Sequence, residues 1–263
     1  MASGKNSRAV RNARAAVVTK RSTPWGMIAA ILVVVLFAGG IFGYYVVENN
    51  AKQEKAAALA QWTPSDTNKD PSLKIPGIVT QQYAGANHVQ PNQVVAYTHS
   101  PPFGGTHDGY WAACNGVVYP TAVRNENMVH ALEHGSVWIA YNPDKITGDA
   151  VQTLAAKING QPYSLMSPYP GLDQPISLQS WGHQLKLSDP NDPRIDEFIQ
   201  ALRSNQYQYP EPGASCAALG PGAFDQDNPP PYKPAPPVSA VNNTSVMPEV
   251  IPGAQGVTPD PAQ

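Results

Sequence analysis

The sequence lacks the motifs that mark several common enzyme classes. It has no glycine-rich phosphate loop, no serine nucleophile elbow, no Cys-x-x-Cys pair and no calcium-binding loop. Cysteine is scarce, since 263 residues include only Cys114 and Cys216. We therefore predict no catalytic residue, and the sequence favours a binding protein over an enzyme.

The N-terminal segment has no negatively charged residue, and the apolar segment that follows it has no charged residue at all. Residues 1–24 contain six lysines or arginines and no acid, whereas residues 26–47 are uncharged and apolar. A helix of that length crosses about 30 Å of hydrocarbon, and basic flanks stay cytoplasmic. We predict a basic cytoplasmic leader (1–24) and a transmembrane helix (25–47). The alternative is a cleaved signal peptide, although both the leader and the apolar run are long for one.

The chain beyond the leader is acidic, with 11 basic and 19 acidic residues. This balance argues against a nucleic-acid partner. Beside a spanning helix, the basic leader is better interpreted as an orientation signal that contacts anionic lipid. The predicted location is the plasma membrane in a single pass, with the lipid bilayer as the first partner and the rest of the chain extracytoplasmic.

The two cysteines fit an external location because disulfides persist in oxidising compartments. We favour a Cys114–Cys216 disulfide, which would tie the end of the domain to the segment before residues 125–135. The alternatives are a Cys114 thiolate that binds a metal and two unpaired buried cysteines.

Composition divides the remainder of the chain into three parts. Residues 48–74 are predicted to be a helical stalk and a proline-interrupted linker, and residues 75–220 one globular domain. Residues 221–263 are predicted to be a disordered tail, because ten of the 35 residues from 229 to 263 are proline. This Pro-rich tail is a candidate docking segment for an envelope protein.

Periodicity within the domain predicts helices and strands without a strict βαβ order. We expect helices over 125–135, 149–159 and from 189 or 192 to 202, and strands over 94–98, 137–141, 175–181 and 183–187. Asn125 or Asn127 is the expected cap of the first helix, and Gly135 its end. The predicted fold class is therefore α+β, with one compact mixed domain.

The strongest functional signal is a histidine pair in that first helix. His130 and His134 are spaced i, i+4 and share a face, and Glu133 lies between them. The glycine-containing loop at 100–107 is placed to bring His107 to this face, and three imidazoles form the protein part of a zinc or copper site. Glu133 is then a fourth ligand, a general base or an acceptor from an imidazole N–H.

Two other interpretations use the same residues. Histidines in the last turn of a helix are stabilised by its dipole and can be purely structural. His-x-x-Glu-His also occurs in inverzincin metallopeptidases, where a distant glutamate such as Glu211 would complete the zinc site. Here Gly135 ends the helix and a strand follows at once, which does not match that family. Met128 offers a thioether that would favour Cu(I), and Tyr97 and His99 are weaker candidates.

Several separated blocks of the sequence together resemble a known family. They are Ser100-Pro-Pro-x-Gly-Gly-x-His107, Cys114-x-Gly-x-x-Tyr119, Val129-His130-x-Leu-Glu133-His134-Gly-x-Val137, Ser180-Trp-Gly182 and Pro210-Glu-Pro-x-x-x-Cys216. Over about 95–218 the chain resembles the actinobacterial and proteobacterial DUF3105 family. The resemblance implies a membrane-anchored or exported protein of uncharacterised function. It also implies a shared polar cluster of His107, His130, Glu133 and His134.

We therefore predict a single-pass membrane protein whose extracytoplasmic domain binds copper or zinc, with His107, His130, His134 and Glu133 as the metal site. The alternative is a non-catalytic envelope assembly module in which the histidines are structural. A zinc-dependent hydrolase is a third interpretation, for which the sequence names no substrate.

Overall fold

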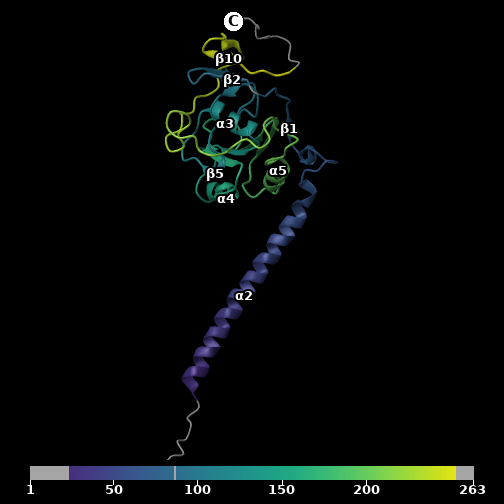
Figure 1. Ribbon diagram of the computed structural model, residues 1–263, viewed down its shortest axis with the longest axis vertical. Helices are drawn as coiled ribbons and strands as arrows, with labels where there is room; N and C mark the ends of the chain where they lie inside the picture. Colours follow the sequence, from purple (N-terminus) through teal and green to yellow (C-terminus); the bar gives the residue numbers. More distant parts are fainter. Residues whose placement is uncertain (1–23, 86, 253–263) are drawn as a thin grey trace, which may run out of the picture. The chain divides into compact units, whose positions relative to one another are not determined.

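The computed structural model describes residues 24–85 and 87–252. The chain divides into two units, Met1–Ala56 and Ala57–Gln263, which are described separately. Figure 1 shows the long helix α2 of the first unit and the mixed helices and strands of the second.

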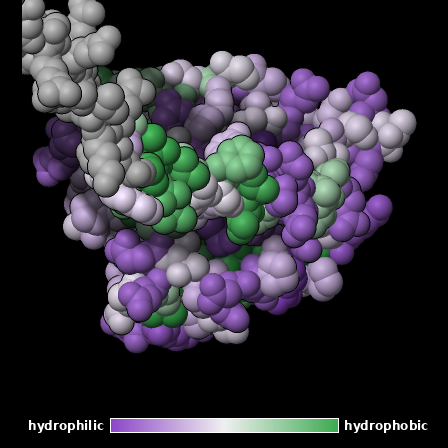
Figure 2. All heavy atoms as spheres, turned by 90° about the horizontal axis from the view of Figure 1, so that it is seen from below, coloured by the Kyte–Doolittle hydropathy of each residue, from purple (hydrophilic) through white to green (hydrophobic). Residues whose placement is uncertain are grey.

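The first unit contains most of helix α2 (Trp25–Leu59). Within the described residues, this is the one helix long and apolar enough to cross a membrane. Its apolar side chains are largely exposed, Leu36 at 74% and Phe37 at 70%. In Figure 2 hydrophobic residues gather within a surface that is otherwise mostly hydrophilic. The helix includes the span predicted at 25–47, whereas residues 1–23 of the predicted leader lie outside the described residues.

The second unit is built on a six-stranded mixed sheet with the strand order β1–β9–β8–β6–β7–β5. The strands are β1 (Val79–Thr80), β5 (Asn115–Val118), β6 (Val137–Tyr141), β7 (Ser164–Pro168), β8 (Ile176–Ser180) and β9 (His183–Leu187). β5 and β6 run parallel to β7, whereas β6, β8, β9 and β1 pair antiparallel. The α+β class predicted from the sequence is confirmed.

Helices cover both faces of this sheet. They are α3 (Asn125–Glu133), α4 (Asp149–Ile158) and α5 (Arg194–Leu202). The unit also contains the 3-10 turns η1 (Ala60–Trp62), η2 (Pro71–Lys74) and η3 (Val238–Ala240). Alternate residues of β6 enter two different cores, as the period of two predicts. Val137 and Ile139 join the core that includes residues of α4 and α5, and Trp138 joins the core that includes residues of α3. The central strand is therefore buried on both faces.

The N-terminal end of helix α3 was predicted wrongly and its C-terminal end correctly. The expected Asn125 or Asn127 cap is wrong, because the N-cap is Arg124 and no side chain caps the helix. The Asn127 amide instead donates to a backbone carbonyl at 2.8 Å. At the other end His134 is the C-cap, and Gly135 has φ +89°, the left-handed conformation in which glycine ends helices.

Two short parallel strand pairs lie outside the main sheet. β2 (His88–Val89) pairs with β4 (His107–Asp108), and this register sets His88 opposite His107. β3 (Val94–Ala96) pairs with β10 (Val246–Pro248), so the strand expected at 94–98 is shorter than predicted. Both pairs join segments that are distant in the sequence.

The C-terminal segment differs from the disordered tail predicted over 221–263, as far as residue 252. Phe224 is fully buried, β10 pairs with β3, and the Thr98 N–H donates to the Glu249 carboxylate at 2.9 Å. Isolated contacts hold this segment on the domain, and it contains no run of apolar residues. For this reason composition did not indicate that the segment is ordered. Residues 253–263 lie outside the described residues.

Residues 57–74 of the predicted stalk and linker belong to the second unit, where Trp62 and Ser72 are buried. Prolines interrupt long elements here, as expected, but they leave room for short turns, and Pro71 begins η2. Just beyond the linker, β1 pairs with β9 through Val79 and Gln184.

Candidate metal centre

Strand β4 and helix α3 bring three of the predicted site residues together. His107 and Glu133 are both fully buried, and the Nε2 atom of His107 lies 2.8 Å from the Oε2 atom of Glu133. The rings of His107 and His130 are 4.7 Å apart between centroids. The 100–107 loop therefore brings His107 to the face of α3 that carries His130 and Glu133.

His88, which the sequence analysis missed, joins these residues. Its Nε2 atom lies 4.0 Å from the Glu133 carboxylate, and its ring stacks on that of His130 at 5.2 Å. One donor atom from each of four side chains lies within 4.8 Å of the others. We call this set, His88, His107, His130 and Glu133, the four-residue group. His88 lies in a two-residue strand. A strand this short leaves no periodic pattern in the sequence from which it could be predicted.

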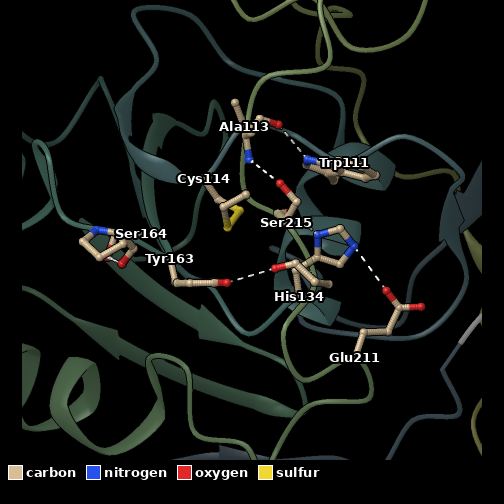
Figure 3. The surroundings of a disulfide bond; sticks show 12 residues. Trp111, Ala113, Cys114, His134, Tyr163, Ser164, Glu211 and Ser215 are labelled. Carbon is tan, nitrogen blue, oxygen red and sulfur yellow. Dashed lines mark hydrogen bonds and ion pairs between the residues drawn. A yellow bond between two sulfur atoms is a disulfide. The ribbon is translucent and has the colours of Figure 1, made fainter.

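His134 lies in a second set. It forms, with His130 and Glu211, a three-residue group whose donor atoms also lie within 4.8 Å of one another. The Nε2 atom of His134 is 3.3 Å from the Glu211 carboxylate, and Figure 3 shows this pair beside the disulfide. The structure thus brings the predicted residues together as two overlapping groups that share His130, rather than as one.

Backbone carbonyls orient three of the imidazoles. Each Nδ1 atom lies 2.6 to 2.7 Å from a carbonyl oxygen, in the pairs His107–Gly105, His130–Asp108 and His134–Ser215. A carbonyl only accepts, so Nδ1 carries the proton and donates, which leaves the Nε2 lone pair for a ligand. This arrangement fixes the ring orientation and tautomer that metal-binding histidines need.

The two histidines outside both groups, His99 and His183, have other partners. His183 has both ring nitrogens in hydrogen bonds, Nδ1 with the Trp181 carbonyl at 2.7 Å and Nε2 with Asp70 at 3.0 Å. His99 interacts with the Thr98 hydroxyl at 3.1 Å and belongs to neither group. The weaker candidates predicted from the sequence are also elsewhere engaged, because the Tyr97 hydroxyl donates to a carbonyl at 2.7 Å and Met128 packs in the apolar core.

The spacing of the donor atoms suits a transition metal. Four ligands about 2.0–2.1 Å from a tetrahedral ion lie about 3.3 Å apart, and the distances from Glu133 to His107 and His88 are 2.8 and 4.0 Å. Burying a carboxylate is costly unless a cation or donors compensate its charge. A divalent ion among these donors would supply that compensation for Glu133.

The histidines of α3 are neutral at physiological pH. Burial and the adjacent His107 and His134 lower the pKa of His130 to about 3. Burial also lowers the pKa of His134, despite the nearby carboxylates. Both Nε2 lone pairs are therefore available at pH 7 without the loss of a proton.

An ion-pair network supports the position of β4. Arg124 binds the Asp108 carboxylate and lies 3.2 Å from the Glu126 carboxylate. Glu126 in turn accepts from the Val95 N–H at 2.8 Å. Because the Asp108 carbonyl is the acceptor for His130, this network holds the atom that orients a central imidazole.

The disulfide supports the other side of the site. Cys114 and Cys216, the pair favoured from the sequence, form a disulfide with their Cα atoms 4.7 Å apart. The Cys114 N–H donates to the Cys216 carbonyl at 3.0 Å. In this bonded form neither sulfur is a thiolate, so the alternative of a Cys114 metal ligand is not realised.

Comparison with curated proteins and with solved structures gave no match. Among family descriptions, that of a protein of unknown function (DUF3105) matches residues 88–218. This range begins at His88 and includes every member of both histidine groups. The chain belongs to the DUF3105 family.

Proposed function

We propose that this protein is a single-pass membrane protein whose external domain binds one divalent transition metal, zinc or copper, at the four-residue group. The observation that best supports it is the convergence of imidazole nitrogens on one buried carboxylate. His107 and His130 come from separate segments, and each presents Nε2 because a carbonyl holds its Nδ1 proton. Structural histidines need no such shared orientation toward one point.

The donor set favours particular metals. Three imidazoles and one carboxylate suit Zn²⁺ and Cu²⁺, whereas Ca²⁺ and Mg²⁺ prefer all-oxygen ligands. Cu(I) prefers thiolate or thioether ligands, but the cysteines form a disulfide and Met128 lies in the apolar core. We therefore propose the divalent ions.

The content of metal in the full-length protein tests this function. The protein would be purified in detergent micelles through a tag without histidine, equilibrated with Zn²⁺ or Cu²⁺, and passed over a desalting column. We expect one ion per chain, retained in the control His99→Asn, whose histidine belongs to neither group, and lost in His107→Asn and His130→Asn. Wild-type protein that elutes without metal, or variants that bind as the control does, would contradict the proposal.

The external location is supported by three features of the chain. Helix α2 is long and apolar enough to span a membrane, basic residues precede it, and the domain beyond it holds a disulfide. Cytoplasmic proteins rarely keep disulfides. A C-terminal alkaline phosphatase fusion should be active only if the domain is external, and the mass of the membrane-bound protein should equal the uncleaved chain. An inactive fusion or a cleaved chain would exclude this topology.

One observation keeps a hydrolase as the second candidate. Glu211 lies 3.3 Å from His134, so the three-residue group has the two-histidine, one-glutamate ligands of the inverzincin pattern, with Glu133 as the base. Full burial of Glu133 against His107 favours its role as a ligand instead. The variant Glu133→Gln distinguishes the two functions. A ligand role predicts at least tenfold weaker metal binding, whereas a base role predicts unchanged binding.

A further inference from the structure

We propose that the three-residue group is a transfer position through which the metal ion enters and leaves the four-residue group, with His130 as the shared ligand. The proposal deepens the metal-binding function above and rests on it. It assigns His134 and Glu211 to the exchange of the ion rather than to its retention.

The shared histidine can serve only one ion at a time. The Nδ1 atom of His130 donates to the Asp108 carbonyl at 2.6 Å, so a single lone pair, on Nε2, remains for a metal. Both groups include this atom among donors that lie within 4.8 Å. Two ions cannot each use it, and an ion in one group therefore excludes a fully coordinated ion in the other.

The two groups differ in the number of donors and in how many of them are fully buried. The four-residue group offers four side chains; His107 and Glu133 have no exposed surface, and the His88 side chain is 44% exposed. The three-residue group offers only three side chains, none of them without exposed surface, and its Glu211 side chain is 41% exposed. An ion is held more strongly where more ligands surround it. The difference in the number of ligands makes the first group the resting position and the second, weaker group the point of exchange.

The two groups are joined through the backbone as well as through His130. The Glu211 N–H donates to the Glu133 carbonyl, so the loop that carries the exposed carboxylate is attached to the end of α3. An ion passing between the groups keeps its bond to His130 while the other ligands are exchanged. It therefore never has to return to water as a free ion during the transfer.

Exchange kinetics of the full-length protein in detergent micelles test this assignment. Zn²⁺ loading and its removal by a chromophoric chelator would be followed by stopped flow for wild type and for Glu211→Gln. Glu197→Gln on α5, outside both groups, is the matched control, and His134→Asn is a second variant. Circular dichroism verifies that each variant is folded. Because Glu211 is partly exposed, its replacement should leave the fold intact.

We expect Glu211→Gln and His134→Asn to bind one Zn²⁺ with an affinity within threefold of wild type, while loading and removal each slow at least tenfold. If the affinity is unchanged, both rates must change by the same factor. Unchanged rates, two bound ions in wild type, or an affinity loss as large as that of His107→Asn would each overturn the transfer role. Wild-type protein that binds no Zn²⁺ or Cu²⁺ would instead overturn the metal-binding function itself.

Discussion

His134 donates its Nδ1 proton to the backbone carbonyl of Ser215, the residue immediately before Cys216. The Cys114–Cys216 disulfide therefore fixes the acceptor that orients this imidazole (Figure 3). On the other side of His134 the Nε2 atom faces Glu211, which belongs to the same loop. One covalent bond thus positions His134 and Glu211, while His130 and the four-residue group depend on β4 and α3.

Removal of the disulfide should lower stability without abolishing metal binding. For Cys114→Ser/Cys216→Ser we expect the free energy of unfolding to fall by about 2–5 kcal/mol, because a cross-link across a long loop constrains the unfolded chain. The four-residue group should still hold one ion, since the carbonyls that orient His107 and His130 belong to Gly105 and Asp108, outside the loop that the disulfide ties. Denaturant unfolding and metal analysis test this, and wild type treated with a reductant should behave like the variant. Equal stability of variant and wild type would contradict it.

The Arg124 network should be essential for the fold. Replacement of Arg124 by Met leaves Asp108 and Glu126 buried without their cation, and breaking a buried ion pair from one side costs about 3–5 kcal/mol. Urea unfolding of Arg124→Met measures this loss. Arg194→Met is the matched control, because Arg194 pairs with Asp192 at a more exposed position, where such pairs contribute about 0–1 kcal/mol. Equal effects of the two substitutions would show that burial of the network is unimportant.

The Asp70–His183 pair predicts a pH-dependent part of the stability. Burial raises the pKa of Asp70, but hydrogen bonds from His183 and Ser72 outweigh it, so the pKa lies below its ordinary value of 3.8. A carboxyl whose folded pKa is lowered stabilises the protein above its ordinary pKa, and that stability is lost as pH falls through the folded value. Asp70→Asn should therefore cost about 1 kcal/mol at pH 6. The difference from wild type should shrink as the pH falls below 3.8, and a difference independent of pH would contradict this origin.

Local sequence patterns predicted the regular elements well where those elements are long enough to show a period. Strand β9 has the predicted bounds, and helix α4 ends within one residue of them. The parallel strand β7 was missed because Ser164–Pro168 contains two serines and a proline around only two apolar residues. Serine and proline are typical of turns, so the segment carries no strand signal.

The site was predictable only as far as it is local in the sequence. The i, i+4 spacing of His130 and His134 fixed their common face, and the glycines near His107 indicated a close approach. The roles of His88 and Glu211 depend on the β2–β4 register and on the loop tied by the disulfide. Neither contact leaves a periodic signal, so the division into two overlapping groups emerges only from the tertiary structure.

Gly85 should be required for metal binding because of its contact with Glu133. A Cβ atom at this position would lie 2.8 Å from the Glu133 Oε1 atom and 2.7 Å from the Pro210 side chain, so Gly85→Ala must displace the carboxylate or the loop that leads to Glu211. We expect at least tenfold weaker Zn²⁺ binding, measured by competition with a chelator. Gly109→Ala is the matched control, since a Cβ atom at position 109 would meet nothing within 4 Å. The Zn²⁺ affinity of this variant should equal that of wild type. Wild-type affinity in Gly85→Ala would show that Glu133 is not a ligand or that its position tolerates this displacement, and Glu133→Gln separates these two outcomes.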